Sequence, residues 1–357
     1  MTTKTKPVDI AVVGLGHLHP RLYMPLFASL PETQVTAVVE ADADLRRAFA
    51  ADFKVQAYSN VAALLKEQRP EAAFVFLPHA DCPAAAEALA RAGVHLFVEK
   101  PMAASAAGAE RIERAARKAR VRLATGYCWR LHPAAREIKS LVASGVLGDI
   151  VGGEGRIAAG RLQRYLDGHS PWMLDRKRSG GGPMYNLGVH WIDLLRWMLN
   201  DEVAEVSGRN VQVNTRYDIE DNSFAHLRFR KGAVVALDIS YTVPDAFPYG
   251  RDLYLSLRGT RGVVSWAPAY EGEKDVVFVV SDDPRFAGSP KRHLQFDLEP
   301  VKGYSGYMGR EIIRAFVQAI RKGGEPPVTG RDGVAALKVV EAVYRSAERK
   351  RWVEVPR

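Results

Sequence analysis

Short apolar segments alternate with longer Ala-, Leu- and Arg-rich segments through the first third of this 357-residue chain. The apolar segments have strand length and are Ile10–Val13, Val35–Val39, Ala73–Leu77, Val94–Val98 and Val121–Ala124. The segments between them have helical spacing and are Arg21–Leu30, Asp44–Phe53, Ala84–Ala92 and Ala106–Ala119. Continuously apolar strands are buried on both faces, and helical connections join them in parallel. Right-handed crossovers then predict a first domain, residues 1–126, built on a doubly wound parallel sheet.

The pattern changes after residue 126. Helical segments are expected at Pro133–Ala143 and Tyr185–Asn200. Alternating strands follow, and they are Val203–Val213, Ser223–Arg230, Ala233–Tyr241, Leu253–Leu257, Gly262–Trp266 and Val276–Val280. Tight turns such as Gly259–Gly262 suit hairpins, which favours a mainly antiparallel sheet. With closing helices over Gly306–Arg321 and Asp332–Lys350, we expect an α+β domain over residues 127–357, whose last helix and strand are free to pack back on the first.

Charge and cysteine content narrow the partners and the compartment. The net charge of +9 is compatible with an anionic partner, but the basic residues are scattered along helices such as Arg111–Arg122. We interpret them as a solvated surface and expect no nucleic acid. Cys82 and Cys128 form no Cys-x-x-Cys pair, and no His/Cys cluster suggests a metal. With neither a signal peptide nor an apolar run of ~20 residues, we expect a cytoplasmic protein that binds no membrane.

A glycine-containing loop follows the first strand directly. Gly14 permits a tight turn, and Gly16 lets the backbone approach a pyrophosphate at the N-terminus of the next helix. His17 and Leu18 continue the loop and are expected to contact the same ligand. His19 stands where a third glycine is usual, so a wider turn is expected. The strand–loop–helix context predicts dinucleotide binding; the alternative is a turn without a ligand.

An acidic residue, Glu40, ends the second strand. A carboxylate there can accept hydrogen bonds from both ribose hydroxyls of the adenosine half, and it repels a 2′-phosphate. The sequence therefore favours NAD. Arg46 and Arg47 follow within two turns and weaken this discrimination, so NADP is not excluded.

Two further motifs stand directly at the ends of predicted secondary-structure elements. Glu99–Pro101 comes straight after a predicted strand, and Gly180–Asp193 opens the long helix with a run of glycines. Together with Trp129–Pro133, Gly145–Gly148 and Gly330–Gly333, these motifs resemble the Gfo/Idh/MocA family of oxidoreductases over nearly the whole chain. The resemblance implies a Rossmann domain, and a second domain with an open-faced sheet through which copies associate as a homodimer or homotetramer. It also implies nicotinamide-dependent redox chemistry on sugars, polyols or related compounds.

The resemblance assigns the chemistry to three residues. Lys100 stands at the carboxyl end of a parallel strand, where its ammonium can hydrogen-bond the reacting oxygen. His190 titrates near neutrality and shares one stripe of the expected helix with Asn186 and Asp193. Asn186 departs from the family, which usually carries Asp there, and an amide cannot become anionic. Lys100, Asn186 and His190 are the expected catalytic and substrate-binding set, with a proton relay weakened at Asn186.

Other residues are expected on the cofactor or the substrate. The resemblance places Leu77, Pro78 and His79 at the nucleotide's edge, with Glu99 nearby. Arg130 is expected either at the nicotinamide or in a structural salt bridge. The loop over residues 160–182 offers Trp172 for stacking on a sugar, although such a loop can instead pack against a partner subunit. The same loop carries candidate ligands for a carboxylate or phosphate, namely Arg161, Arg164 and Arg176.

The leading hypothesis is an enzyme that transfers a hydride between NAD(P) and a secondary alcohol or ketone of a sugar, polyol or sugar-derived acid. A second hypothesis is a redox-neutral, lyase- or glycosidase-like enzyme that works on retained NAD. A third is a nucleotide-sensing regulatory protein, which Asn186 suggests and the presence of Lys100 and His190 opposes.

Overall fold

The computed structural model describes residues 6–270 and 273–357, which form two compact units. Unit 1 extends to Cys128 and includes Tyr165–Gly180 and Val301–Ala335. Unit 2 consists of Trp129–Arg164, Gly181–Pro300 and Ala336–Arg357. The chain therefore contributes two late segments to the unit that it begins with. The domain boundary between residues 126 and 127 remains a prediction.

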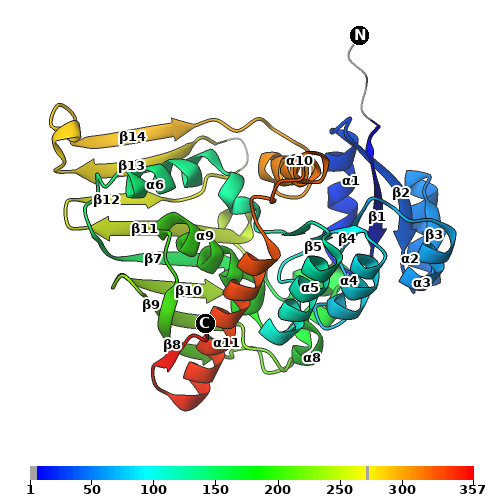
Figure 1. Cartoon of the computed structure of the whole chain (residues 1–357). Helices are drawn as coiled ribbons and strands as arrows, with labels where there is room; N and C mark the ends of the chain where they lie inside the picture. The colour runs from blue at the N-terminus through cyan, green and yellow to red at the C-terminus, as the bar shows by residue number, and fades with distance from the viewer. Residues whose placement is uncertain (1–5, 271–272) are drawn as a thin grey trace, which may run out of the picture. The chain divides into compact units, whose positions relative to one another are not determined.

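Unit 1 is built on a six-stranded parallel sheet with the order β3-β2-β1-β4-β5-β6, which Figure 1 shows in blue and cyan. Its strands are β1 (Val8–Val13), β2 (Thr33–Val39), β3 (Gln56–Tyr58), β4 (Ala72–Val75), β5 (His95–Val98) and β6 (Leu123–Thr125). The order reverses between β1 and β4, which are hydrogen-bonded neighbours. The predicted doubly wound parallel sheet is confirmed.

Helices cover this sheet in two groups. Residues of α1 (Pro20–Ala28) contact α2 (Ala43–Phe53) through an Arg21–Asp52 ion pair, and α1 packs on α10 (Gly306–Lys322). The second group consists of α3 (Val61–Glu67), α4 (Cys82–Arg91) and α5 (Ala106–Ala119), which contact one another in turn. The strands between them are buried, as their continuous apolar sequence predicts.

The prediction missed β3 and α3. The strand has only three residues, of which Gln56 and Ala57 are exposed, so no apolar run marks it. The helix buries a single residue, Leu64, and its start depends on the Asn60 side chain, which accepts a hydrogen bond from the Ala63 amide. Short elements at a sheet edge bury too little surface to leave a periodic pattern in the sequence.

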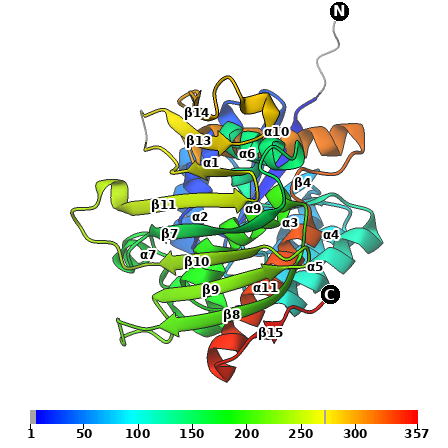
Figure 2. The same ribbon diagram turned by 90° about the vertical axis from the view of Figure 1, so that its left-hand side faces the viewer.

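Unit 2 is built on a nine-stranded sheet with the order β14-β13-β12-β11-β7-β10-β9-β8-β15, which Figure 2 shows face on. Its strands are β7 (Ile150–Ala159), β8 (Val203–Val211), β9 (Asn222–Phe229), β10 (Val234–Ser240), β11 (Arg251–Gly259), β12 (Gly262–Trp266), β13 (Asp275–Ser281), β14 (Lys291–Phe296) and β15 (Val353–Glu354). Among the described strands of this sheet, only β7 and β10 pair in parallel, so the predicted, mainly antiparallel sheet is confirmed.

The helices α6 (Pro133–Ala143) and α9 (Val189–Leu199) pack against each other, and α6 also packs on β13. The sequence did not reveal β7, because its glycines resemble a loop. A Cβ on Gly155 would lie 2.4 Å from the Trp191 ring of α9, and one on Gly153 would lie 2.2 Å from the Ser256 carbonyl. The glycines therefore let this central strand pack closely beneath a buried tryptophan and beside its neighbour β11.

The remaining helices are α7 (Gln163–Asp167), α8 (Arg176–Ser179) and α11 (Gly330–Arg349). The first two lie in the segment that the sequence presents as a long loop. Across the described residues, no helix combines the length and apolar character that crossing a membrane requires.

Candidate active site

The loop between β1 and α1 leaves open space above one of its glycines. Gly14 has a φ of +90°, and a Cβ on it would lie 2.9 Å from the Leu77 backbone nitrogen, so glycine is required there. A Cβ on Gly16 would meet no atom within 4 Å. Within the described part of the chain, the amides of Gly16, His17 and Leu18 have no hydrogen-bond acceptor. Open space and available amides ahead of a helix suit a pyrophosphate, so this loop fits the expected dinucleotide.

Glu40 lies beside this loop at the end of β2. Its carboxylate accepts a hydrogen bond from the Leu15 amide at 2.6 Å and another from the Asp42 amide at 2.9 Å. Arg46 donates to the Glu40 backbone carbonyl at 2.6 Å, while Arg47 pairs with an acidic neighbour on α2. The carboxylate is therefore held next to the nucleotide loop, and neither arginine forms an ion pair with it in the structure.

A distant segment of the chain is bonded to the same loop. The Ser170 hydroxyl and the Trp172 indole both donate to the Gly16 carbonyl. At the loop after β4, His79 Nδ1 lies 2.7 Å from the Ser179 carbonyl. Because β1 and β4 are neighbours where the strand order reverses, these bonds fasten the segment to both sides of the crevice in which doubly wound sheets bind ligands.

Two buried imidazoles accompany the Trp172 indole. Its ring centroid lies 5.8 Å from that of His17 and 4.8 Å from that of His79. Burial lowers the pKa of His79 to about 4, and burial with the nearby His19 holds the pKa of His17 well below its ordinary value. Both rings are therefore neutral at neutral pH. The Nε2 atoms of His17 and His79 are buried without a hydrogen-bond partner among the residues described, which leaves them available to a bound ligand.

Glu99 is held in a buried polar cluster directly ahead of Lys100. The Tyr23 hydroxyl donates to its carboxylate at 3.0 Å, and His19 Nδ1 lies 3.6 Å from the other oxygen. The His19 ring in turn stacks on Tyr304 at 3.8 Å. Lys100 follows at the carboxyl end of β5 and is 3% exposed. All strands of this sheet are parallel, so Lys100 and the nucleotide loop lie at the same edge.

The sequence did not reveal the partners of Glu99. Tyr23 has the spacing of an ordinary core residue of α1, and Tyr304 comes from a segment about 280 residues further along the chain. Burial, followed by the neighbouring Glu99, raises the pKa of Tyr23, so its hydroxyl stays a donor. His19, which replaces the usual third glycine, thus packs against Tyr304 and Glu99.

The helix expected over Tyr185–Asn200 is divided in the structure. Met184–Gly188 forms a π-helical turn, and α9 follows it. A Cβ on Gly188 would lie 2.4 Å from the Met184 sulfur, so the missing side chain permits this turn. Asn186 therefore lies in the π-helical turn and His190 in α9, so a regular α-helix does not carry both residues, and their shared stripe remains a prediction.

The polar residues of this helix have separate partners. Asn186 is buried, and its amide donates to the Tyr241 hydroxyl at 3.0 Å. Arg130 donates to both oxygens of the Asp193 carboxylate, in a buried pair with one distance of 2.8 Å. The structure thus places Arg130 in the structural salt bridge that the sequence left open as an alternative. His190 is also buried, at 6% exposure.

A buried acid supports the glycine run ahead of the π-helical turn. The Gly182 amide donates to the Tyr344 hydroxyl at 3.0 Å and to Glu220 at 3.2 Å, and the Tyr344 hydroxyl donates to the same carboxylate. A Cβ on Gly181 would lie 2.3 Å from the Tyr344 oxygen. The glycines therefore allow a tyrosine and a carboxylate to reach the backbone, which no sequence motif indicates.

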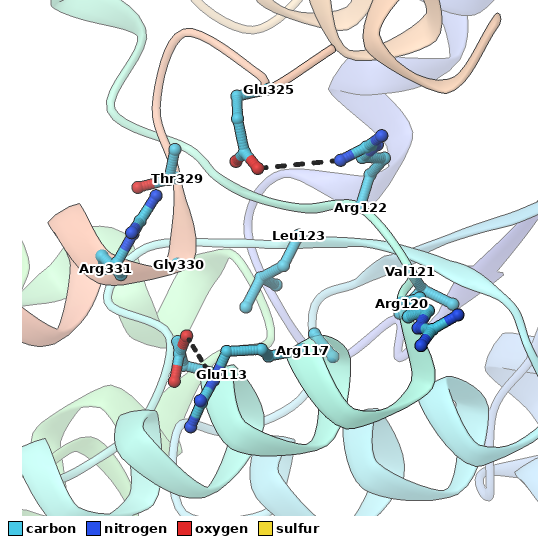
Figure 3. A pocket seen from close by; sticks show the side chains of 11 residues that line it. Glu113, Arg117, Arg120, Val121, Arg122, Leu123, Glu325, Thr329, Gly330 and Arg331 are labelled. Atoms are coloured by element: carbon cyan, nitrogen blue, oxygen red, sulfur yellow. Dashed lines mark ion pairs between the residues drawn. The ribbon is translucent and has the colours of Figure 1, made fainter. Parts of the chain in front are cut away.

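A polar pocket of unit 1, of about 360 Å³, lies at the amino-end edge of the parallel sheet, where β6 begins. Figure 3 shows the side chains that line it. Leu123, the first residue of β6, forms its centre, and four arginines are among its lining residues. Two of them are paired: Arg122 lies 3.6 Å from Glu325, and Arg117 lies 3.5 Å from Glu113. Ligands of doubly wound sheets bind at the carboxyl ends of the strands, so this amino-end pocket is separate from the candidate site.

Comparisons with known proteins agree with this architecture. Residues 8–127 match the model of an oxidoreductase family described as an NAD-binding Rossmann fold, and residues 139–355 match that family's C-terminal alpha/beta domain. A myo-inositol 2-dehydrogenase of Thermotoga maritima is 25% identical over 352 residues, which cover 97% of this chain and 98% of the relative. A 1,5-anhydro-D-fructose reductase of Ensifer adhaerens is 29% identical over 269 residues, 74% of each chain.

A solved structure shows the same fold. The WlbA dehydrogenase of Bordetella pertussis, in complex with NADH and UDP-GlcNAcA, superimposes with a TM-score of 0.81 at 21% identity. The match covers 99% of this chain and all of the other.

We expect His79 to make stability depend on pH. Its folded pKa of about 4 lies below the ordinary value of 6.5, so its contribution is complete above about pH 6.5 and is lost as the pH falls towards 4. His79→Asn keeps an N–H donor for the Ser179 carbonyl but does not titrate there. Between pH 7 and 4.5 the variant should lose about 2–3 kcal/mol less unfolding free energy than the wild type, measured with urea.

The exposed His169→Asn, which makes the same change from imidazole to amide outside the sheets, is the matched control. Identical profiles for His79→Asn and the wild type would show that the buried imidazole has no influence on stability.

Proposed function

Because the chain belongs to the Gfo/Idh/MocA family of NAD(P)-dependent oxidoreductases, we propose that it interconverts a secondary alcohol and a ketone on a sugar, polyol or sugar-derived acid. NAD is the proposed cofactor. The observation that carries the proposal is a buried lysine, Lys100, at the same sheet edge as a glycine loop with open space and available amides. The relatives named as inositol and anhydrofructose enzymes support substrates with several hydroxyl groups.

Several residues of unit 1 would hold the cofactor. The amides ahead of α1 suit the pyrophosphate, and Glu40 suits the ribose hydroxyls next to the adenine. We assign Leu77, Pro78 and His79 to the nucleotide's edge, since they form the other side of the crevice. When bound, the nicotinamide supplies the hydride acceptor or donor.

In the proposed mechanism, Lys100 acts on the reacting oxygen and His190 acts on the hydroxyl proton. Lys100 donates a hydrogen bond to the reacting oxygen and stabilises the negative charge that develops there. His190 takes the hydroxyl proton during oxidation and returns it during reduction. Asn186, which is oriented by Tyr241, positions the substrate hydroxyl. Glu99 acts as a positioning residue, because Tyr23 and His19 fix it immediately before the lysine.

The proposed substrate contact of Trp172 is joined by a second role. Its indole donates to the Gly16 carbonyl, and its ring lies against His79. A side chain in this position shields the nucleotide loop from water and slows the departure of a bound cofactor. This contact favours a second candidate function, in which the enzyme oxidises and then reduces its substrate on retained NAD without net redox change.

We also propose that copies of the chain associate through the open face of the nine-stranded sheet, as a homodimer or homotetramer. Along β9 the side chains alternate between buried and exposed, and Phe224 on the exposed side is 43% accessible. An aromatic residue exposed on a broad sheet is typical of a surface that another copy covers.

Glu40 should set the choice of cofactor. NADH is expected to bind more tightly than NADPH, and Glu40→Gln should reduce the preference by about tenfold, since the amide keeps an acceptor but no longer repels a 2′-phosphate. Titration of nucleotide fluorescence measures the dissociation constants of NADH and NADPH. The exposed Glu67→Gln on α3 is the control, and equal affinities in the wild type would contradict the assignment of Glu40.

Removal of either proposed proton-transfer group should slow turnover. Lys100→Met and His190→Ala should each lower kcat by at least ~100-fold on a panel of polyols and sugars, while NADH still binds. The exposed Lys118→Met serves as the control. Unchanged turnover would remove that residue from the mechanism, and a wild type that retains NAD(H) without net redox change would favour the second candidate function.

Asn186→Asp tests the departure from the family. The Tyr241 hydroxyl can turn and donate to the new carboxylate, so the fold should be preserved. A negative charge should raise the proton affinity of His190 and increase kcat by about tenfold, with the lower pKa of the pH–rate profile shifted upwards. A loss of activity would show that the site is built around an amide.

A further inference from the structure

Unit 2 contains an arginine-rich pocket at the end of its central strand. The pocket has a volume of about 460 Å³ and lies where β7 ends and β11 begins. Its lining residues are Ala159, Gly160, Arg161, Arg164, Tyr249, Gly250 and Arg251. Three of these side chains are guanidinium groups, and none of the lining residues is acidic. The residues that line the pocket therefore carry a net positive charge.

The three arginines are unequally satisfied by the protein. Arg161 donates to the carbonyls of Val243 and Pro244 at 3.2 and 2.8 Å, and its ion pair with Asp245 is open to solvent, because that carboxylate is 96% exposed. These bonds hold the Arg161 guanidinium in place. Because the ion pair is exposed to water, the Asp245 carboxylate does not neutralise the guanidinium charge. A positioned guanidinium of this kind is preorganised for an anion.

Arg251 and Arg164 leave donors available. Arg251 Nε is buried and has no hydrogen-bond acceptor among the residues that the structure describes, although a terminal nitrogen reaches the Ala269 carbonyl at 3.3 Å. Arg164 is exposed and forms no ion pair within residues 6–270 and 273–357. A buried N–H without an acceptor is unfavourable unless a ligand supplies the missing oxygen.

The backbone around the pocket adopts the left-handed conformation at three residues. Gly160 and Gly250 have φ values of +91° and +62°. Tyr249, in the segment between β10 and β11, has a φ of +53°, which is strained for a residue with a side chain. The Tyr249 ring is 66% exposed and stacks on Tyr270 at 4.7 Å. Strained backbone and an exposed aromatic ring beside incompletely satisfied guanidinium groups are typical of a binding site.

The pocket lies at the same edge of the sheet as the residue that orients Asn186. Because β7 and β10 are parallel, their carboxyl ends meet, with Ala158 opposite Ser240. Tyr241 follows Ser240 directly and accepts the hydrogen bond from the Asn186 amide. Two residues further on, about 7 Å along an extended chain, the Val243 carbonyl accepts from Arg161. One short segment thus connects Asn186 with the arginines.

We propose that this pocket binds an anionic group of the substrate, so that the enzyme acts on an acidic sugar derivative rather than on a neutral polyol. The inference rests on the proposed function, since it places the anion at a distance from the carbon that is oxidised or reduced. Planar guanidinium groups match both a carboxylate and a phosphate, so the shared chemistry is an oxyanion with two or more acceptor oxygens. The exposed Tyr249 ring is suited to the sugar face next to it.

Steady-state kinetics on three matched compounds test the proposal: a hexuronate, a hexose phosphate and the parent neutral hexose. The anion that fits should have a kcat/KM at least about tenfold above that of the neutral hexose. Arg164→Gln, an exposed change that leaves the fold intact, should lower kcat/KM for that anion by about tenfold, mainly through KM, and should leave the neutral hexose unaffected. The matched control is Arg331→Gln, an exposed arginine of the pocket in Figure 3.

The comparison of hexuronate with hexose phosphate decides whether the oxyanion is a carboxylate or a phosphate. A neutral hexose used as well as both anions, or equal losses for charged and neutral compounds in Arg164→Gln, would overturn the proposal while the oxidoreductase assignment stands.

Calorimetric titration of the wild type and Arg164→Gln with each anion separates this proposal from the proposed function. Anion binding that Arg164→Gln weakens, without turnover of any compound, would retain the pocket and overturn the function. Absence of both binding and turnover for the two anions would overturn the anion site.

Discussion

The close approach of two backbone segments governs the arrangement of unit 1. Gly14, at the end of β1, lies so near Leu77, after β4, that a single added methyl group would be 2.9 Å from a backbone nitrogen. This contact brings together the loops on either side of the point where the strand order reverses. The open space above Gly16, the anchored Glu40 and the buried Lys100 all lie at the edge that this contact defines. A side chain at position 14 would therefore separate the two loops as well as strain a turn.

Two carboxylates of the candidate site, Glu99 and Glu40, are held by neutral hydrogen-bond donors. Tyr23 donates to Glu99, and backbone amides donate to Glu40. The buried imidazoles beside Trp172 have pKa values too low for them to be charged at neutral pH. An anionic cofactor placed here would thus interact with amides and neutral rings, which supply hydrogen bonds without attracting other anions strongly. In unit 2, in contrast, three arginines line one pocket at the end of β7.

Sequence patterns were sufficient wherever burial is continuous or strictly alternating. Apart from β3, the strands of the parallel sheet and the position of Glu40 follow from apolar runs and from where each run ends. Sequence patterns failed to predict the structure where contacts with other residues, rather than local conformational preference, determine the backbone. The strand β7 is formed by glycines that Trp191 and Ser256 require. The π-helical turn before His190 was missed for a different reason, since it depends on a local contact between Gly188 and Met184 that no periodic pattern marks. Tyr241 could not be connected with Asn186, because that bond joins residues 55 positions apart.

The bonds from Ser170 and Trp172 to the Gly16 carbonyl have a consequence for how such a protein can change. The segment that carries these side chains comes from the long loop where substrate contacts are expected, yet it braces the turn on which a nucleotide would rest. Insertions or deletions that reshape this loop for a new substrate would also alter the rate at which cofactor leaves. Substrate range and cofactor retention are therefore coupled in this chain. A protein engineer who redesigns the one should expect to change the other.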